Sequence, residues 1–241
     1  MRQVIALGGG GFSMEPENPL LDRYILQQCN KENPKICFIG TASGDSEGYI
    51  ERFYNFFKLE NCQPTHLSLF KPQTRDIKKF ILSQDIIYVG GGNTKNLMIL
   101  WREWQLDGIL RQAYEKGIIL AGLSAGALCW FEEGMTDSLG SGYESISCLG
   151  IIQGSHCPHY DGEDDRGSTY RMAIQDGKIG SGFAADDGVA LHYIDGEMHQ
   201  VVSSRPDAQG YRVDKDKETK LPTLYLGEVQ QITASIVKNK I

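Results

Sequence analysis

One serine of this chain stands where a nucleophile could be placed. Residues Gly122 to Gly126 read GLSAG and fit the pattern G-x-S-x-G, whose small neighbours permit a strained turn between a strand and a helix. Such a turn would lift the hydroxyl of Ser124 into a cleft, where it could attack a carbonyl carbon. The run KGIIL before the motif suits a strand, and ALCWF after it suits a helix. An inert turn rich in small residues would look the same, so other residues must decide.

A serine hydroxyl also needs a base that removes its proton. His156 and His159 lie in IIQGSHCPHY, just after an apolar run that would deliver them to a strand end. The other histidines lie in an apparent strand or in the later hairpin tail, where partly exposed imidazoles without a role are expected. They are His66, His192 and His199. Residue chemistry alone leaves both His156 and His159 open as the base.

Two further requirements are an acid that orients the imidazole and N–H donors that stabilise an oxyanion. The segment AADDG offers Asp186 and Asp187 in a turn after an apolar stretch. Ala125 follows the serine and supplies one N–H group. We expect Gly92, in the segment VGGGNT at the end of a neighbouring strand, to supply the second donor.

The stretch GGGGFS raises the alternative of a phosphate cradle. Its spacing puts Ser13 where a dinucleotide fingerprint needs its third glycine, and Thr41 stands where an acidic residue would bind the ribose. The six cysteines include no C-x-x-C pair and no spacing typical of a metal site. We therefore expect no organic cofactor, no metal and no disulfide framework.

Together, the ordered motifs VGGGNT, GLSAGA, CPHY and DDG resemble the aspartyl dipeptidase (peptidase E) and cyanophycinase family of serine peptidases. The resemblance extends roughly from Val4 to Val202. It implies a three-layer α/β/α sandwich, similar to class I glutamine amidotransferases and flavodoxin-like in its mostly parallel sheet. It also implies that Ser124 is the nucleophile and His159 the base, with Gly92 and Ala125 as the oxyanion donors.

The sequence departs from that family at two positions. Asp187 stands before Gly188 where the family typically has a glutamate, so the orienting acid is shorter by one methylene. In the aspartyl dipeptidases, an arginine in a T-R stretch is thought to receive the substrate's aspartate side chain. Here the segment GSTYRMAI puts Tyr170 at that place and Arg171 one residue later. We expect one of these two to line the substrate pocket, with Tyr170 favoured.

The elements that must position these residues follow from hydrophobic periodicity. Apolar runs alternate with stretches of helical spacing at residues 18–30, 48–59 and 94–116, which predicts β-α units around a mostly parallel sheet. After about Ser181 the pattern alternates and turns on Asp-Gly pairs, which predicts antiparallel hairpins at the sheet's edge. The predicted strands are QVIALGGG, KICFIGTAS, THLSLF, DIIYVGGG and GIILAGLS. We expect one domain over residues 1–241.

Composition limits the partners of this chain. Its formal charge is −7 and its 24 lysines and arginines are dispersed, so a nucleic-acid footprint is not expected. The apolar stretch at the N-terminus is too short for a signal peptide or a membrane span, which predicts a cytoplasmic protein without membrane contact. We expect a monomer or a homodimer. The expected activity is hydrolysis of dipeptides or short peptides. The alternatives are a related amide or ester hydrolase, an acyltransferase, or an inactive relative that binds a small ligand.

Overall fold

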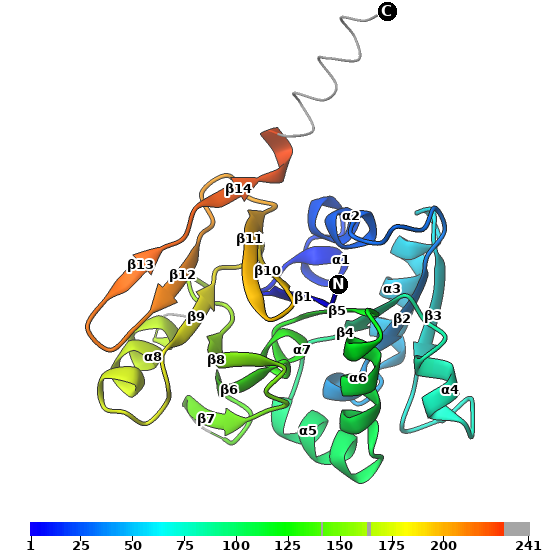
Figure 1. Ribbon diagram of the computed structural model, residues 1–241, viewed down its shortest axis with the longest axis horizontal. Helices are drawn as coiled ribbons and strands as arrows, with labels where there is room; N and C mark the ends of the chain where they lie inside the picture. Colours follow the sequence, from blue (N-terminus) through cyan, green and yellow to red (C-terminus); the bar gives the residue numbers. More distant parts are fainter. Residues whose placement is uncertain (141, 163–164, 229–241) are drawn as a thin grey trace, which may run out of the picture.

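The computed structural model describes residues 1–140, 142–162 and 165–228 of the chain (Figure 1). Its larger sheet has eight strands in the order β14-β11-β10-β1-β5-β4-β2-β3. Five of them run parallel and overlap the five predicted apolar runs, although β3 starts two residues before the run THLSLF and ends three residues before its end. They are β1 (Gln3–Leu7), β2 (Lys35–Ile39), β3 (Gln63–Leu67), β4 (Ile86–Val89) and β5 (Ile119–Leu123).

Helices cover both faces of this sheet, because alternate side chains of each buried strand point to opposite faces. On β1, Ile5 and Leu7 pack with one group of helices, and Val4 and Ala6 pack with the other. The first group is α1 (Gly11–Met14), α2 (Leu20–Gln27) and α3 (Glu47–Phe57). The second group is α4 (Ile77–Ile81), α5 (Thr94–Glu103) and α6 (Leu106–Glu115). The chain therefore has the α/β layered architecture that the sequence predicts.

The helical pattern over residues 94–116 is divided into two helices. Gln105 adopts a left-handed conformation with φ of 55°, which ends α5 and lets α6 start in a new direction. Asn93 caps α5, since its side chain accepts a hydrogen bond of 2.8 Å from the Asn96 N–H. Periodicity could not reveal the break, because the apolar residues on both sides of it face the same sheet.

A second sheet, which the sequence analysis did not predict, lies beside the first one (Figure 1). Its six strands have the order β13-β12-β9-β8-β6-β7. Helix α8 (Arg166–Gln175) packs against this sheet through Tyr170 and Ile174. The strands are β6 (Phe131–Thr136), β7 (Glu144–Ser147), β8 (Ile152–Cys157), β9 (Gly182–Ala185), β12 (Gly210–Val213) and β13 (Glu218–Lys220). They are short and mostly rich in polar residues, which hides them from a periodicity search.

The predicted hairpin tail is divided between the two sheets. Strands β10 (Val189–Ile194) and β11 (Glu197–Ser203) form an antiparallel hairpin that extends the main sheet beside β1, and β14 (Thr223–Tyr225) follows. His192 on β10 is buried instead of exposed, because the Tyr24 hydroxyl and the Gln3 side chain bond its two ring nitrogens. In the described ranges, no helix is both long and apolar enough to cross a membrane.

Candidate active site

Ser124 occupies a strained turn between β5 and the short helix α7 (Ala125–Leu128). Its φ of 55° and ψ of −119° lie in a region that residues other than glycine rarely adopt. The glycines of the motif make this turn possible. A Cβ atom at Gly122 would lie 2.3 Å from the Gly126 oxygen, and one at Gly126 would lie 2.2 Å from the Val89 oxygen. The motif thus has the strand–turn–helix geometry of a nucleophile elbow.

His159 and Asp187 are in direct contact, although 28 residues separate them. The His159 Nδ1 atom lies 2.6 Å from Asp187 Oδ1, and both side chains are 15% exposed. The pKa of Asp187 is lowered, first by this hydrogen bond and the positive charge of a protonated imidazole, and also by the cations of Arg205 and Arg166. The carboxylate is thus ionised while it holds one ring nitrogen.

The second sheet explains why these two residues meet. Strand β8 ends at Cys157, just before His159, and strand β9 ends at Ala185, just before Asp187. The two strands are parallel neighbours, with Cys157 opposite Ala184. Because the carboxyl ends of parallel neighbours meet at one edge of a sheet, both loops emerge side by side.

The glycine stretch after β1 joins this edge to Ser124. The Leu7 oxygen accepts a hydrogen bond of 3.1 Å from the Ser124 N–H, and the Gly8 oxygen accepts one of 3.3 Å from the His159 N–H. Gly9 forms a parallel bridge with Asp187. A Cβ atom at Gly9 would lie 2.0 Å from Asp187 Oδ1 and 2.9 Å from His159 Cε1, so only glycine fits there.

Sequence reasoning considered this stretch only as a phosphate cradle and missed its structural role. The pattern that could have revealed it is a run of glycines directly after a buried strand, which allows other backbone to approach closely. Within the described part of the chain, no hydrogen bond joins the Ser124 hydroxyl to His159. In proteins without substrate such bonds are often long and form only in the complex.

Two backbone N–H groups near Ser124 make no hydrogen bond among the described residues. A Cβ atom at Gly91 would lie 3.2 Å from the Ser124 Cβ, so the end of β4 lies against the serine. Gly92 has φ of 136° and packs on the Ala42 oxygen of the 3₁₀ helix η1 (Thr41–Ser43). Among the described residues, the N–H groups of Gly92 and Ala125 have no acceptor, whereas the Gly91 N–H donates to the Tyr49 hydroxyl.

The other member of each ambiguous pair is buried and has different partners. His156 is buried, stacks on Phe131 with 4.6 Å between ring centroids, and has its pKa lowered to about 3 by burial. Asp186 is also buried, which raises its pKa to about 6, and its carboxylate accepts the Gln209 N–H at 2.9 Å. His159 and Asp187 are therefore the members of the two pairs that lie in contact.

The structure corrects the expectation for Tyr170. This residue is fully buried, and its hydroxyl lies 2.6 Å from Ser155 Oγ, so the prediction that it lines a substrate pocket is wrong. Tyr170 lies on the inner face of α8, so its ring packs in the core beneath the second sheet. Arg171, one residue later, is partly exposed and bonds Glu218 at 3.0 Å and the Tyr160 hydroxyl at 2.9 Å.

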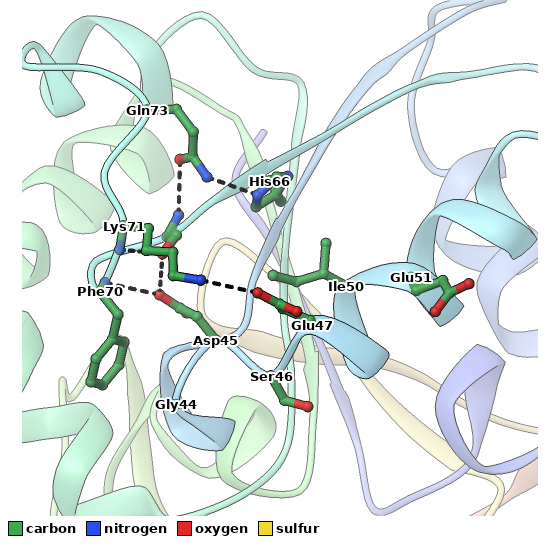
Figure 2. Close-up of a pocket in the computed structure, with 11 residues that line it drawn as sticks. Gly44, Asp45, Ser46, Glu47, Ile50, Glu51, His66, Phe70, Lys71 and Gln73 are labelled. Atoms are coloured by element: carbon green, nitrogen blue, oxygen red, sulfur yellow. Dashed lines mark hydrogen bonds and ion pairs between the residues drawn. The ribbon is translucent and has the colours of Figure 1, made fainter.

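A cavity of about 490 Å³ lies away from these residues, at the carboxyl ends of β2 and β3 (Figure 2). Most of its polar side chains already have hydrogen-bond partners in the cavity wall. Gln73 bonds His66, Lys71 bonds Glu47, and Asp45 accepts the Phe70 N–H. None of the predicted site residues lines it. Across the described residues, no cluster of three or more histidine, cysteine or carboxylate side chains could hold a metal ion.

Comparisons with known proteins identify the family of this chain. The model of peptidase family S51 matches residues 4–201. The uncharacterized peptidase YgaJ of Bacillus subtilis (strain 168) is 56% identical over 231 residues, which cover 94% of this chain and 100% of that protein. A solved peptidase from an acI-B1 actinobacterium matches with a TM-score of 0.68 at 22% identity, covering 92% of this chain and 95% of its own.

A second solved structure, a putative peptidase E protein from Listeria monocytogenes EGD-e, matches with a TM-score of 0.60 at 16% identity. The match covers 89% of this chain and 100% of that protein. At such low sequence identities, the two structures support the fold alone. The family model, which matches most of the chain, and the YgaJ relative establish that this chain belongs to peptidase family S51.

Proposed function

We propose that this protein is a serine peptidase that hydrolyses dipeptides or short peptides through an acyl-enzyme on Ser124. The observation that carries the proposal is the 2.6 Å contact between His159 and Asp187, held beside the strained turn of Ser124 by one glycine stretch. An imidazole, an ionised acid and a serine on an elbow are the three groups that acyl transfer requires.

In this mechanism Asp187 fixes the tautomer of His159. The carboxylate accepts a hydrogen bond from Nδ1–H, which leaves the lone pair of Nε2 free to act as a base. Nε2 takes the Ser124 hydroxyl proton as Oγ attacks the peptide carbonyl carbon, and the resulting imidazolium gives that proton to the departing amine. Water then attacks the acyl-enzyme, again with proton removal by Nε2, and releases the acid product and Ser124.

The developing oxyanion would be stabilised by the Ala125 and Gly92 N–H groups. Both are free of acceptors among the described residues, and the rigid packing of Gly92 on η1 fixes one of them before substrate arrives. Donors that are already oriented cost no reorganisation during the reaction, and one such donor is worth roughly 3–4 kcal/mol in the transition state.

Ser124→Ala tests the proposal. Removing one oxygen from a turn built for small residues should leave the thermal melting curve unchanged and reduce kcat on a dipeptide panel by a factor on the order of 10⁴ or more. A fluorophosphonate probe should label the wild-type protein at Ser124 and should not label the variant. A variant with full activity would reject the proposal.

The same probe separates the alternatives. A related amide or ester hydrolase or an acyltransferase on the same nucleophile would be labelled but would prefer an ester substrate or an amine acceptor over peptide hydrolysis. An inactive relative that binds a small ligand would not be labelled at all. Membership of peptidase family S51 favours peptides as the first substrates to test.

A further inference from the structure

The contact between His159 and Asp187 depends on where the main chain of residue 187 lies. An aspartate is one methylene shorter than the glutamate expected at this place, so its backbone must approach the His159 loop more closely. Two glycines leave room for its carboxylate. A Cβ atom at Gly162 would lie 3.0 Å from Asp187 Oδ2, and one at Gly9 would lie 2.0 Å from Oδ1.

One side chain of the His159 loop holds this main chain directly. The Oδ1 atom of Asp161 accepts a hydrogen bond of 2.8 Å from the Asp187 N–H. Asp161 follows His159 closely, so one short segment presents the imidazole and also binds the residue that orients it. The peptides just after β1 do not bond the Asp187 N–H. The Gly9 oxygen accepts the N–H of Gly188, and the Gly8 oxygen accepts that of His159.

We propose that Asp161 is a positioning residue, which sets the backbone of Asp187 at the distance from which its short carboxylate reaches His159 Nδ1. This inference rests on the proposed function, in which Asp187 orients the base. Asp161 does not touch the reacting atoms in this role. It acts through the hydrogen bond to the Asp187 amide.

The charges around Asp161 favour a role for its hydrogen bond over a role for its charge. After burial, its carboxylate contributes to the raised pKa of Asp186, so these two like charges repel one another. Arg205 offsets part of this repulsion. Its pKa is raised by Glu15, which bonds it at 2.5 Å, and then by Asp187 and Asp161. A neutral acceptor at residue 161 would keep the hydrogen bond and lose the repulsion.

Asp161→Asn and Asp161→Ala separate these roles, because an asparagine oxygen can accept the same N–H and a methyl group cannot. Asp161 is exposed, so both variants should keep the melting temperature of the wild type. We expect the alanine variant to lose about tenfold in kcat, as the loss of one hydrogen bond would cause, with KM unchanged. The asparagine variant should stay within about threefold of wild type on the same substrate.

A matched control is Asp165→Ala in the same segment. The Asp165 carboxylate is exposed and makes no capping hydrogen bond to α8. The kcat of this variant should equal that of the wild type. The second readout is the downfield proton resonance of His159 Nδ1–H in one-dimensional NMR, which requires no turnover. It should persist in the asparagine variant and shift upfield or broaden in the alanine variant.

Three results would overturn the inference. An alanine variant with wild-type kcat and resonance would show that Asp161 positions nothing. An asparagine variant as impaired as alanine would assign the effect to charge. A raised KM with unchanged kcat would make Asp161 a substrate contact. If the wild type hydrolyses no peptide, the proposed function fails, while the resonance still decides the role of Asp161.

Discussion

At the scale of single residues, burial distinguishes side chains that the sequence presents as equivalent. His156 and His159 belong to one short segment, yet the first stacks on Phe131 in the core and the second contacts Asp187 at the surface of the site. A buried imidazole with a pKa near 3 stays neutral and cannot reach a substrate.

The two histidines should therefore respond differently to substitution. His159→Ala should reduce kcat about as strongly as Ser124→Ala, because members of a triad act as a unit, and should leave thermal stability unchanged. His156→Ala should instead lower stability by about 2 kcal/mol through a cavity beside Phe131, with activity retained by the folded protein. Steady-state kinetics and urea denaturation measure the two effects. The opposite pattern would move the base to His156.

At the residue scale, the contacts of Arg171 predict whether the protein prefers substrates with an N-terminal aspartate. The Arg171 guanidinium is already paired with Glu218 and the Tyr160 hydroxyl, so it offers an incoming carboxylate little uncompensated charge. We expect Asp-Leu and Ala-Leu to be hydrolysed with similar kcat/KM, and Arg171→Ala to leave their ratio unchanged. A strong preference for Asp-Leu that this substitution abolishes would contradict the expectation and make Arg171 the receptor of the aspartate side chain.

At the scale of secondary-structure elements, the site is assembled where three strand ends meet. Ser124 follows strand β5, His159 follows β8 and Asp187 follows β9. The glycine stretch after β1 hydrogen-bonds or bridges to all three segments. The geometry of the candidate site thus depends on backbone packing at Gly8 and Gly9 as much as on the side chains themselves.

Gly9→Ala tests this dependence. The added methyl group would overlap Asp187 Oδ1 at 2.0 Å and should push the carboxylate away from His159, lowering kcat by roughly two orders of magnitude. Gly108→Ala on α6 is the control, because nothing lies within 4 Å of its Cβ position and alanine favours a helix. Equal kcat for the Gly9 variant and the wild type would exclude the β1 extension as an organiser of the site.

At the scale of the whole molecule, one buried acid makes stability depend on pH. Asp22 on α2 is fully buried, and the Tyr88 hydroxyl and the Phe12 N–H offset only part of the cost of burying its charge. Burial raises its pKa to about 7, against an ordinary value of 3.8. Between these values the folded protein holds a proton that the unfolded chain has released, so its stability falls as the pH rises from about 4 to 7.

Asp22→Asn removes this titration. The shift corresponds to roughly 4 kcal/mol at most, so the variant should gain stability relative to the wild type as the pH rises, most clearly above pH 7. Urea denaturation of both proteins at pH 5 and pH 8 measures the difference. The same difference in free energy of unfolding at both values would mean that Asp22 is not the titrating group.

The sequence by itself determined the features that local pattern encodes. The parallel strands β1, β2, β4 and β5 are nearly continuous apolar runs because both faces of the sheet are covered. The turn at Ser124 is visible because only small residues permit its geometry. Residue chemistry pointed to Gly92 and Ala125, and the family resemblance selected His159; the roles of all three remain predictions.

Only the tertiary structure decided what depends on contacts between distant segments. The second sheet brings His159 and Asp187 together. Its core also buries Tyr170, which could not be seen from the position of Tyr170 one residue before Arg171. Periodicity reports which face of an element is buried, but it does not report which neighbour covers that face. The role of Gly9 has the same origin, since a glycine acts through the atoms that approach it, and those atoms come from residues far along the chain.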